Sequence, residues 1–374
     1  MESFTAPLRE LAEFEEIKRS LHKKPGTLLL SGCVVSQKTH MAYALSDGCP
    51  YTVIALSSEE KARKMYEEYR FLSDNVCYYP AKDLLFYQAD IRGKLLVKER
   101  MEVLQLLLES SDNRQGEGVT VITTMDGFMD SLVPLEKIRE RILTLKSGDA
   151  LDFEELKKQI AMLGYDREVQ IEGPGQFAVR GGILDIYPLT EETPIRIEFW
   201  GDEIDSVRTF DVDSQRSIEN LEEVVIYPAD EFPEEKERVS FIDYFDAENT
   251  ILFLDEPARM LEKGQDIETE VVKARENRAK ETEEHVDLKP EPRFYTTEEV
   301  VKKLNRFSSV GFSALETKCR PFNVIKTWHL QAKSVNPYNN SFDMLTADLK
   351  RLKRSGYRAV LLSGSRTRAK RLAE

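Results

Sequence analysis

Residues 175–216 read GQFAVRGGILDIYPLTEETPIRIEFWGDEIDSVRTFDVDSQR and hold the clearest structural pattern of the chain. Apolar and polar residues alternate at 183–187, at 195–199 and again at 204–210. Successive side chains of a strand point to opposite faces of its sheet, so this alternation predicts half-buried strands. The stretch therefore predicts a small antiparallel sheet with one apolar face and one charged face.

Composition sets the limits for the rest of the chain. With 374 residues, of which 41% are hydrophobic and 32% charged, we expect two or three soluble domains. No apolar run approaches the roughly 20 residues of a membrane span, and the acidic start MESFTAPLRELAEFEEI is unlike a signal peptide. The four scattered cysteines predict reduced thiols, no metal site and a cytoplasmic location. A net charge of −14 argues against a dedicated nucleic-acid coat.

A phosphate-binding loop pattern, G-x-x-x-x-G-K-T, is partly present from Gly32 onward. Lys38 and Thr39 are the residue types that hold phosphate and magnesium, but Gln37 occupies the position of the second glycine. A glycine there lets the backbone amides approach the phosphates closely. Gln37 therefore favours a vestigial nucleotide site, and a working site is the alternative.

A second nucleotide-like pattern is the apolar run at 251–254, which ends in Asp255 and Glu256. It resembles a Walker B strand, in which the first carboxylate holds magnesium and the second activates water. The alternative is a buried strand followed by a helix that begins near Pro257, since proline and acidic residues favour helix N-termini. With Gln37 in the loop, the second interpretation is favoured.

Strand and helix patterns alternate on both sides of residues 135–230, which predicts a parallel, three-layer α/β sheet. We expect a degenerate P-loop-like α/β domain at 1–134, an inserted α+β domain at 135–230, and a second α/β part at 231–374 that is truncated at its C-terminus. The loop with Phe86, Tyr87, Gln88 and Arg92 is either a substrate loop or a structural one.

The last thirty residues form the most basic part of the chain. A strand and a turn are predicted at 357–365 and a helix from Arg366 onward. Lysines and arginines on solvent-exposed helix faces are the default interpretation, and a nucleic-acid face is the alternative.

Three segments together resemble one known family: Y-D-R at 165–167, G-Q-F-A-V-R-G-G-I-L-D-I-Y-P at 175–188, and E-F-W-G-D-E-I-D-S-V-R at 198–208. They resemble the N-terminal region of the bacterial transcription-repair coupling factors, the Mfd family, which is similar to the excision-repair helicase UvrB. The resemblance implies degenerate helicase-like parallel-sheet domains with a UvrB-like insert.

The resemblance also implies a function. In this family the insert recruits UvrA, which brings nucleotide excision repair to stalled RNA polymerase. The ATP- and magnesium-dependent translocase motor, the parts that bind DNA and RNA polymerase, and a C-terminal regulatory domain lie further along a longer polypeptide. We therefore expect no catalytic residue and no cofactor in residues 1–374, and no membrane partner.

By motif match, Arg167 and Arg180 are the expected contacts to UvrA, with five weaker candidates nearby: Phe177, Arg196, Glu198, Asp202 and Asp205. An arginine fork binds a carboxylate bidentately, and arginines and aromatics are enriched at interface hot spots. The alternative role for Arg180 is an internal salt bridge to Asp185 or Glu198. The interface role is favoured because Gly181 and Gly182 follow, which leaves the backbone open to a partner.

Two other functions compete with recruitment. A UvrB-like ATPase or damaged-DNA-binding protein would use a weakened nucleotide site formed by Lys38, Thr39, Asp255 and Glu256. A regulatory role would have the UvrA-binding face covered by the C-terminal domain of the longer protein until the motor engages.

Overall fold

The computed structural model describes residues 2–21, 23–82, 93–112, 118–232, 235–281, 294–335, 337–339, 341–361, 363 and 365–373. The chain divides into two compact units, residues 1–331 and 332–374. Among the described helices, none is both long enough and apolar enough to cross a membrane.

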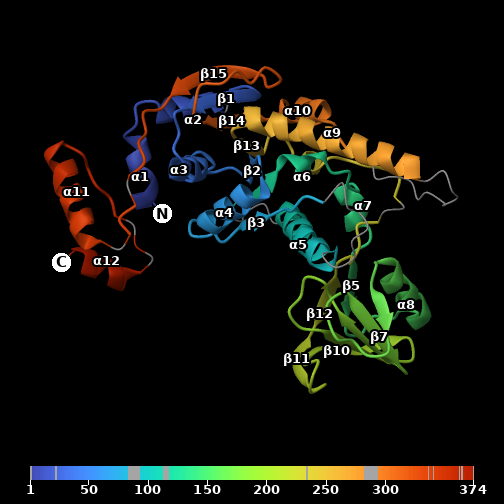
Figure 1. The fold of residues 1–374 in the computed structure, drawn as a ribbon. Helices are drawn as coiled ribbons and strands as arrows, with labels where there is room; N and C mark the ends of the chain where they lie inside the picture. Colours follow the sequence, from blue (N-terminus) through green and yellow to red (C-terminus); the bar gives the residue numbers. More distant parts are fainter. Residues whose placement is uncertain are drawn as a thin grey trace. The chain divides into compact units, whose positions relative to one another are not determined.

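A seven-stranded parallel sheet forms the body of the first unit (Figure 1). Its order is β15-β1-β14-β13-β2-β4-β3, with the bounds β1 (Gly26–Ser31), β2 (Tyr51–Leu56), β3 (Val76–Tyr78), β4 (Val119–Thr124), β13 (Thr250–Asp255), β14 (Ser308–Ser313) and β15 (Val324–His329). The predicted parallel α/β fold is confirmed. Because β14 lies between β1 and β13, strands from both predicted α/β segments share one sheet.

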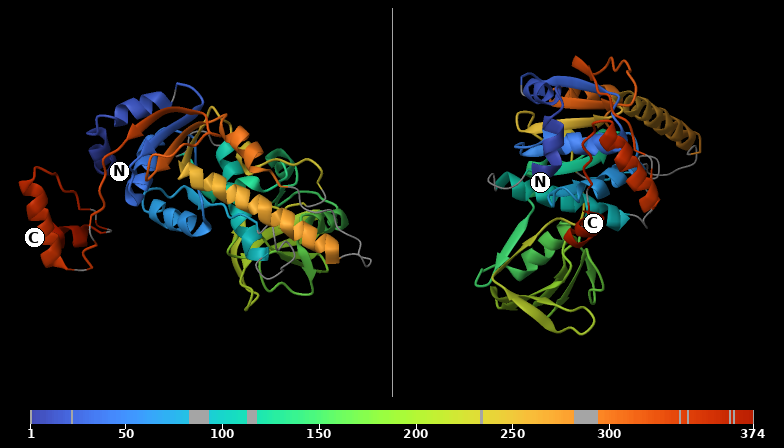
Figure 2. Two further views of the ribbon diagram at one scale, coloured as in Figure 1. Left: turned by 45° about the horizontal axis from the view of Figure 1, so that its top comes forward. Right: turned by 90° about the vertical axis from the view of Figure 1, so that its left-hand side faces the viewer.

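Helices cover both faces of this sheet, as the two further views in Figure 2 also show. Ile54 and Leu56 of β2 pack on one layer, which contains α1 (Glu2–Arg9), α2 (Phe14–Leu21), α3 (Val35–Leu45) and α4 (Glu59–Tyr69). Val53 and Ala55 face the opposite layer, which contains α5 (Gly93–Asp112), α6 (Met125–Met129), η1 (Phe241–Tyr244), α9 (Pro257–Glu281) and α10 (Thr297–Leu304). A strand buried on both faces reads as a continuous apolar run, which is how β2 appears in the sequence.

The insert is built around a six-stranded sheet in the order β11-β10-β9-β8-β7-β6. Its strands are β6 (Asp166–Glu168), β7 (Gln176–Arg180), β8 (Ile183–Tyr187), β9 (Ile195–Trp200), β10 (Glu203–Phe210) and β11 (Ser217–Leu221). The three strands predicted from alternation correspond to β8, β9 and β10. A two-stranded sheet of β5 (Leu143–Lys146) and β12 (Glu223–Ile226) joins the insert to the body through α7 (Leu135–Arg139).

One face of the six-stranded sheet is apolar and buried. Leu184, Ile197 and Val207 pack there against Leu156 and Ile160 of α8 (Phe153–Met162). The opposite face, here called the outer face, carries the charged side chains that follow the same strands in alternation. The predicted apolar face is therefore confirmed, whereas the charged face also holds a small buried apolar cluster that includes Ala178 and Phe210.

The second unit contains α11 (Phe342–Arg354) and α12 (Arg366–Ala373), and neither helix buries a residue. The helix predicted from Arg366 is confirmed. The strand predicted at 357–365 is wrong for residues 357–361, which form no strand. A strand needs a neighbour to complete its hydrogen bonds, and the described residues of this unit offer none.

Candidate functional site

A buried carboxylate, Asp185, lies at the centre of the outer face. Its side chain is 4% exposed, and it accepts two hydrogen bonds from Arg196, from Nε at 2.7 Å and from Nη2 at 2.9 Å. Arg180 adds a third, from Nη2 at 3.0 Å. The hydrogen bond with Asp185 is the main reason why the pKa of Arg196 is raised. Burying a carboxylate is costly unless it is paired in this way, and these three hydrogen bonds supply that pairing within the sheet.

Arg196 is enclosed on three sides. Besides its bonds to Asp185, its Nη2 donates to Gln215 Oε1 at 2.8 Å, and its guanidinium lies over the Phe210 ring, 4.2 Å from the centroid. Its side chain is only 12% exposed. The structure therefore gives Arg196 a structural role, because it holds the outer face together, and the partner contact predicted for it stays a prediction. Gln215 was missed by the sequence analysis, since a glutamine 19 residues away carries no pattern that links it to Arg196.

Arg180 belongs to the same network but faces solvent. Its side chain is 50% exposed, with Nη2 bonded to Asp185 and, at 3.3 Å, to Gln215 Oε1. The internal salt bridge and the exposed guanidinium are both present. Of the two glycines that follow Arg180, only the second is restricted by the space around it. A Cβ on Gly181 would meet open space, whereas a Cβ on Gly182 would lie 2.9 Å from the carbonyl oxygen of Phe199.

Arg167 lies on β6, the exposed edge strand of the sheet. It pairs in register with Phe177 of β7, so the two side chains leave the sheet on the same face. Arg180 lies three residues beyond Phe177 and therefore on the outer face. A partner that contacts both arginines must wrap around the β6 edge.

The weaker candidates divide into buried and exposed residues. Phe177 is 1% exposed and packs in the core of the insert, which contradicts its predicted place at an interface. Glu198 is partly buried and accepts hydrogen bonds from Arg208 and from Ser206. Asp202 and Asp205 are exposed near the turn between β9 and β10.

The loop-like sequence at Gly32 sits at the carboxyl end of β1, where Lys38 is turned inward. Its Nζ lies 2.6 Å from Asp255 Oδ1 and 2.8 Å from Glu256 Oε1. Burial opposes the charge on Lys38, but the charges and hydrogen bonds of Asp255 and Glu256 together outweigh it, and the pKa of Lys38 is raised. Burial likewise opposes ionisation of Glu256, but the hydrogen bond and charge of Lys38, the Ala314 amide and the charge of Arg259 together outweigh it, so the pKa of Glu256 is lowered.

The backbone around this ion pair is also engaged. The amides of Gln37 and Lys38 both donate to the Val34 carbonyl inside the first turn of α3. A Cβ on Gly32, whose φ is +78°, would lie 2.2 Å from the Leu330 carbonyl oxygen. Thr39 Oγ1 donates to Glu68 Oε2 at 3.0 Å instead of facing the loop. The Lys38 ammonium, the Thr39 hydroxyl and the amides of Gln37 and Lys38 therefore contact the protein itself.

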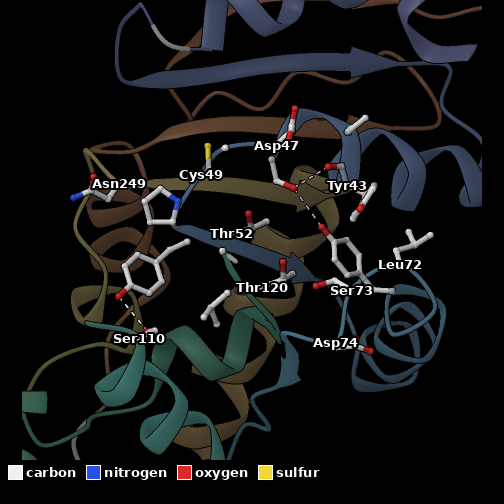
Figure 3. A pocket seen from close by; sticks show the side chains of 18 of the residues that line it. Tyr43, Asp47, Cys49, Thr52, Leu72, Ser73, Asp74, Ser110, Thr120 and Asn249 are labelled. Carbon is white, nitrogen blue, oxygen red and sulfur yellow. Dashed lines mark hydrogen bonds between the residues drawn. The ribbon is translucent and has the colours of Figure 1, made fainter. Parts of the chain in front are cut away.

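A large open cavity of about 1700 Å³ lies at the opposite, amino ends of β2 and β4 (Figure 3). The hydrogen bond between Tyr51 Oη and Ser110 Oγ, 3.2 Å long, lies at its wall. Its lining mixes acidic and basic side chains and includes none of the predicted site residues. In the described part of the chain, no group of His, Cys, Asp and Glu side chains is arranged to hold a metal. The loop with Phe86, Tyr87, Gln88 and Arg92 lies outside the described residues.

Comparison with known proteins agrees with the motifs on the insert. Residues 143–232 match the family described as the UvrB interaction domain. The resemblance inferred from the sequence is confirmed. This UvrB interaction domain comprises both small sheets and α8, and so it contains the Asp185 network and every residue predicted to contact UvrA.

Relatives extend the likeness beyond the UvrB interaction domain. The chain is 30% identical over 244 residues to the transcription-repair-coupling factor of Bacillus subtilis, an alignment that covers 64% of this chain and 20% of that protein. The transcription-repair-coupling factors of Haemophilus influenzae and Staphylococcus epidermidis are 32% and 35% identical over 169 and 164 residues, covering 45% and 44% of this chain and 14% and 13% of theirs. The chain thus matches a fifth or less of each of these relatives.

Proposed function

We propose that the UvrB interaction domain of this chain is a docking platform for UvrA, and that the chain serves as the recruitment module of a transcription-repair coupling factor. The observation that carries the proposal is the half-exposed guanidinium of Arg180 on a well-packed sheet, within the region that matches the UvrB interaction domain. The names of the relatives support the coupling role.

The geometry of Arg180 suits recognition of a carboxylate. Within the described residues only its Nη2 donates hydrogen bonds, to Asp185 and Gln215. The N–H groups of Nε and Nη1 remain available, and each can donate a charge-assisted hydrogen bond to a partner carboxylate. Because Asp185 already fixes the guanidinium, little side-chain entropy is lost on binding.

The test is the affinity of purified UvrA for the Arg180→Ala variant, measured by calorimetry or biolayer interferometry. We expect binding to weaken about 10- to 100-fold, the range of an interface hot spot. The fold should survive, because Asp185 keeps both hydrogen bonds from Arg196. Arg63→Ala is the matched control: Arg63 is about equally exposed and also paired with a carboxylate, but it lies on α4. Unchanged affinity of a folded Arg180→Ala variant would refute the assignment.

We also propose that residues 1–374 do not hydrolyse ATP. Lys38, which a working loop would direct at a phosphate, is held by Asp255 and Glu256. ATP, magnesium, DNA and RNA polymerase would then bind to parts of a longer protein that lie outside these residues. Covering of the UvrA-binding face by such a part stays a prediction, tested by comparing the UvrA affinity of this chain with that of a full-length protein.

A further inference from the structure

Trp200 is the most exposed tryptophan of the chain. It is 85% exposed at the end of β9, while Trp328, the other tryptophan, is 7% exposed. Trp328 Nε1 donates to Glu16, whereas the Trp200 indole makes no hydrogen bond or ring contact among the described residues. Burying an indole is strongly favourable, and tryptophans are enriched among the residues that dominate interfaces. An indole that the fold leaves in water is therefore available to a partner.

The position of Trp200 relates it to Arg180. The turn between β9 and β10 lies at the same end of the sheet as the turn between β7 and β8, and the Phe199 amide donates to the Gly182 carbonyl at 2.8 Å. By alternation from Arg196, Trp200 leaves the sheet on the outer face, which is also the face of Arg180. Two strand spacings across and two residues along place the two Cα atoms about 12 Å apart. A standard interface of about 800 Å² per partner covers both.

Two backbone hydrogen bonds to residues 149–151 fix the turn that carries Trp200. The Leu151 amide donates to the Asp202 carbonyl at 2.7 Å, and the Ile204 amide donates to the Asp149 carbonyl at 2.9 Å. Gly201, with φ +65° and open space around its Cβ position, closes the turn. An aromatic side chain on a backbone fixed in this way loses little entropy on docking.

Exposed acidic side chains follow Trp200 closely in the sequence. Asp202, Glu203 and Asp205 are all exposed next to it in the sequence, and no basic residue lies between Trp200 and Arg208. Complementary charge across an interface fixes orientation and increases the rate of encounter. The matching surface would be an apolar pocket with basic groups at its rim, beside a carboxylate that takes Arg180.

We propose that Trp200 is the apolar anchor of the interface and inserts into such a pocket on UvrA. This inference rests on the proposed function and adds to it a second, chemically different contact. The two side chains at this end of the sheet would then contact two parts of the partner surface. Arg180 would bind a carboxylate, and the indole would enter a pocket with basic groups at its rim.

The first experiment compares UvrA affinities of Trp200→Ala, Trp200→Phe and Met162→Ala. Trp200→Ala should weaken binding at least tenfold, and Trp200→Phe should recover part of the loss because it keeps an aromatic ring. Met162→Ala removes another exposed apolar side chain of the same domain, on α8, and should bind like the wild type. If Arg180→Ala weakens binding while Trp200→Ala does not, the anchor is refuted and the recruitment function stands. If the wild-type chain does not bind UvrA, the proposed function and the anchor both fail.

The second experiment observes the indole directly. Both tryptophans are replaced by 5-fluorotryptophan in this chain alone, and Trp200→Phe assigns the two ¹⁹F resonances. On saturation with unlabelled UvrA, the Trp200 resonance should move and lose its sensitivity to exchange of H₂O for D₂O. The resonance of buried Trp328 serves as an internal reference. A Trp200 resonance that keeps its full solvent sensitivity in the saturated complex would refute the anchor.

Discussion

Replacement of Lys38 by alanine tests whether the loop is closed by an internal ion pair. Lys38 Nζ contacts Asp255 at 2.6 Å and Glu256 at 2.8 Å, and the three side chains are between 7% and 14% exposed. Removing one partner of a buried pair leaves uncompensated charge and costs about 3–5 kcal/mol. We expect Lys38→Ala to lower the free energy of unfolding by about that amount, measured by urea denaturation.

The pH dependence of this loss has a definite sign. The pKa of Glu256 is lower in the folded state than its ordinary value of 4.5. The pairing of Glu256 therefore stabilises the protein above pH 4.5, and this stabilisation is lost as the pH falls through the pKa of the folded state. The pKa of Lys38 is raised above its ordinary value of 10.5. The stabilisation from the charged lysine is therefore complete below pH 10.5 and is lost as the pH rises through the pKa of the folded state. The difference between wild type and Lys38→Ala should therefore be largest between these limits and shrink toward acid.

Controls separate this ion pair from surface charge and from nucleotide binding. Lys146→Ala removes a lysine that pairs with Glu223 on the surface and should leave the urea midpoint unchanged. Magnesium ATP should leave the melting temperature of the wild type unchanged, because a ligand raises it only by binding the folded state. A loss below about 1 kcal/mol in Lys38→Ala would refute the buried pair. An ATP-dependent rise in melting temperature that Lys38→Ala abolishes would instead support a working nucleotide site.

Two further predictions concern the UvrB interaction domain. Arg196→Ala should destabilise the protein by about 2–4 kcal/mol in urea denaturation, because Asp185 then keeps only its hydrogen bond from Arg180. A change below about 1 kcal/mol would show that solvent replaces Arg196 as the partner of Asp185. Phe177→Leu should lower stability by about 1–2 kcal/mol as a core substitution while UvrA affinity of the folded protein stays unchanged. A specific loss of affinity in folded Phe177→Leu would restore Phe177 to the interface.

The sequence predicted those parts whose cause is local. Alternation with period two predicted β8, β9 and β10, because a half-buried sheet requires it of each strand separately. The apolar run of β13 followed by Pro257 predicted a buried strand and the start of a helix, and α9 begins at that proline. Gln37 predicted a defective loop because the close approach of a phosphate depends on the residue at that one position.

Only the tertiary structure decided the roles of individual side chains. Lys38 and Asp255 are 217 residues apart, and their contact exists because β13 and β14 place the carboxyl end of β13 next to the loop after β1. Arg196 and Arg180 read alike in the sequence, yet packing against Phe210 and Gln215 encloses the first and leaves the second half exposed. Burial depends on which distant segments pack together. The sequence pattern could therefore place both arginines on the charged face, but only the fold distinguished Arg196, which has a structural role, from Arg180, which is available to a partner.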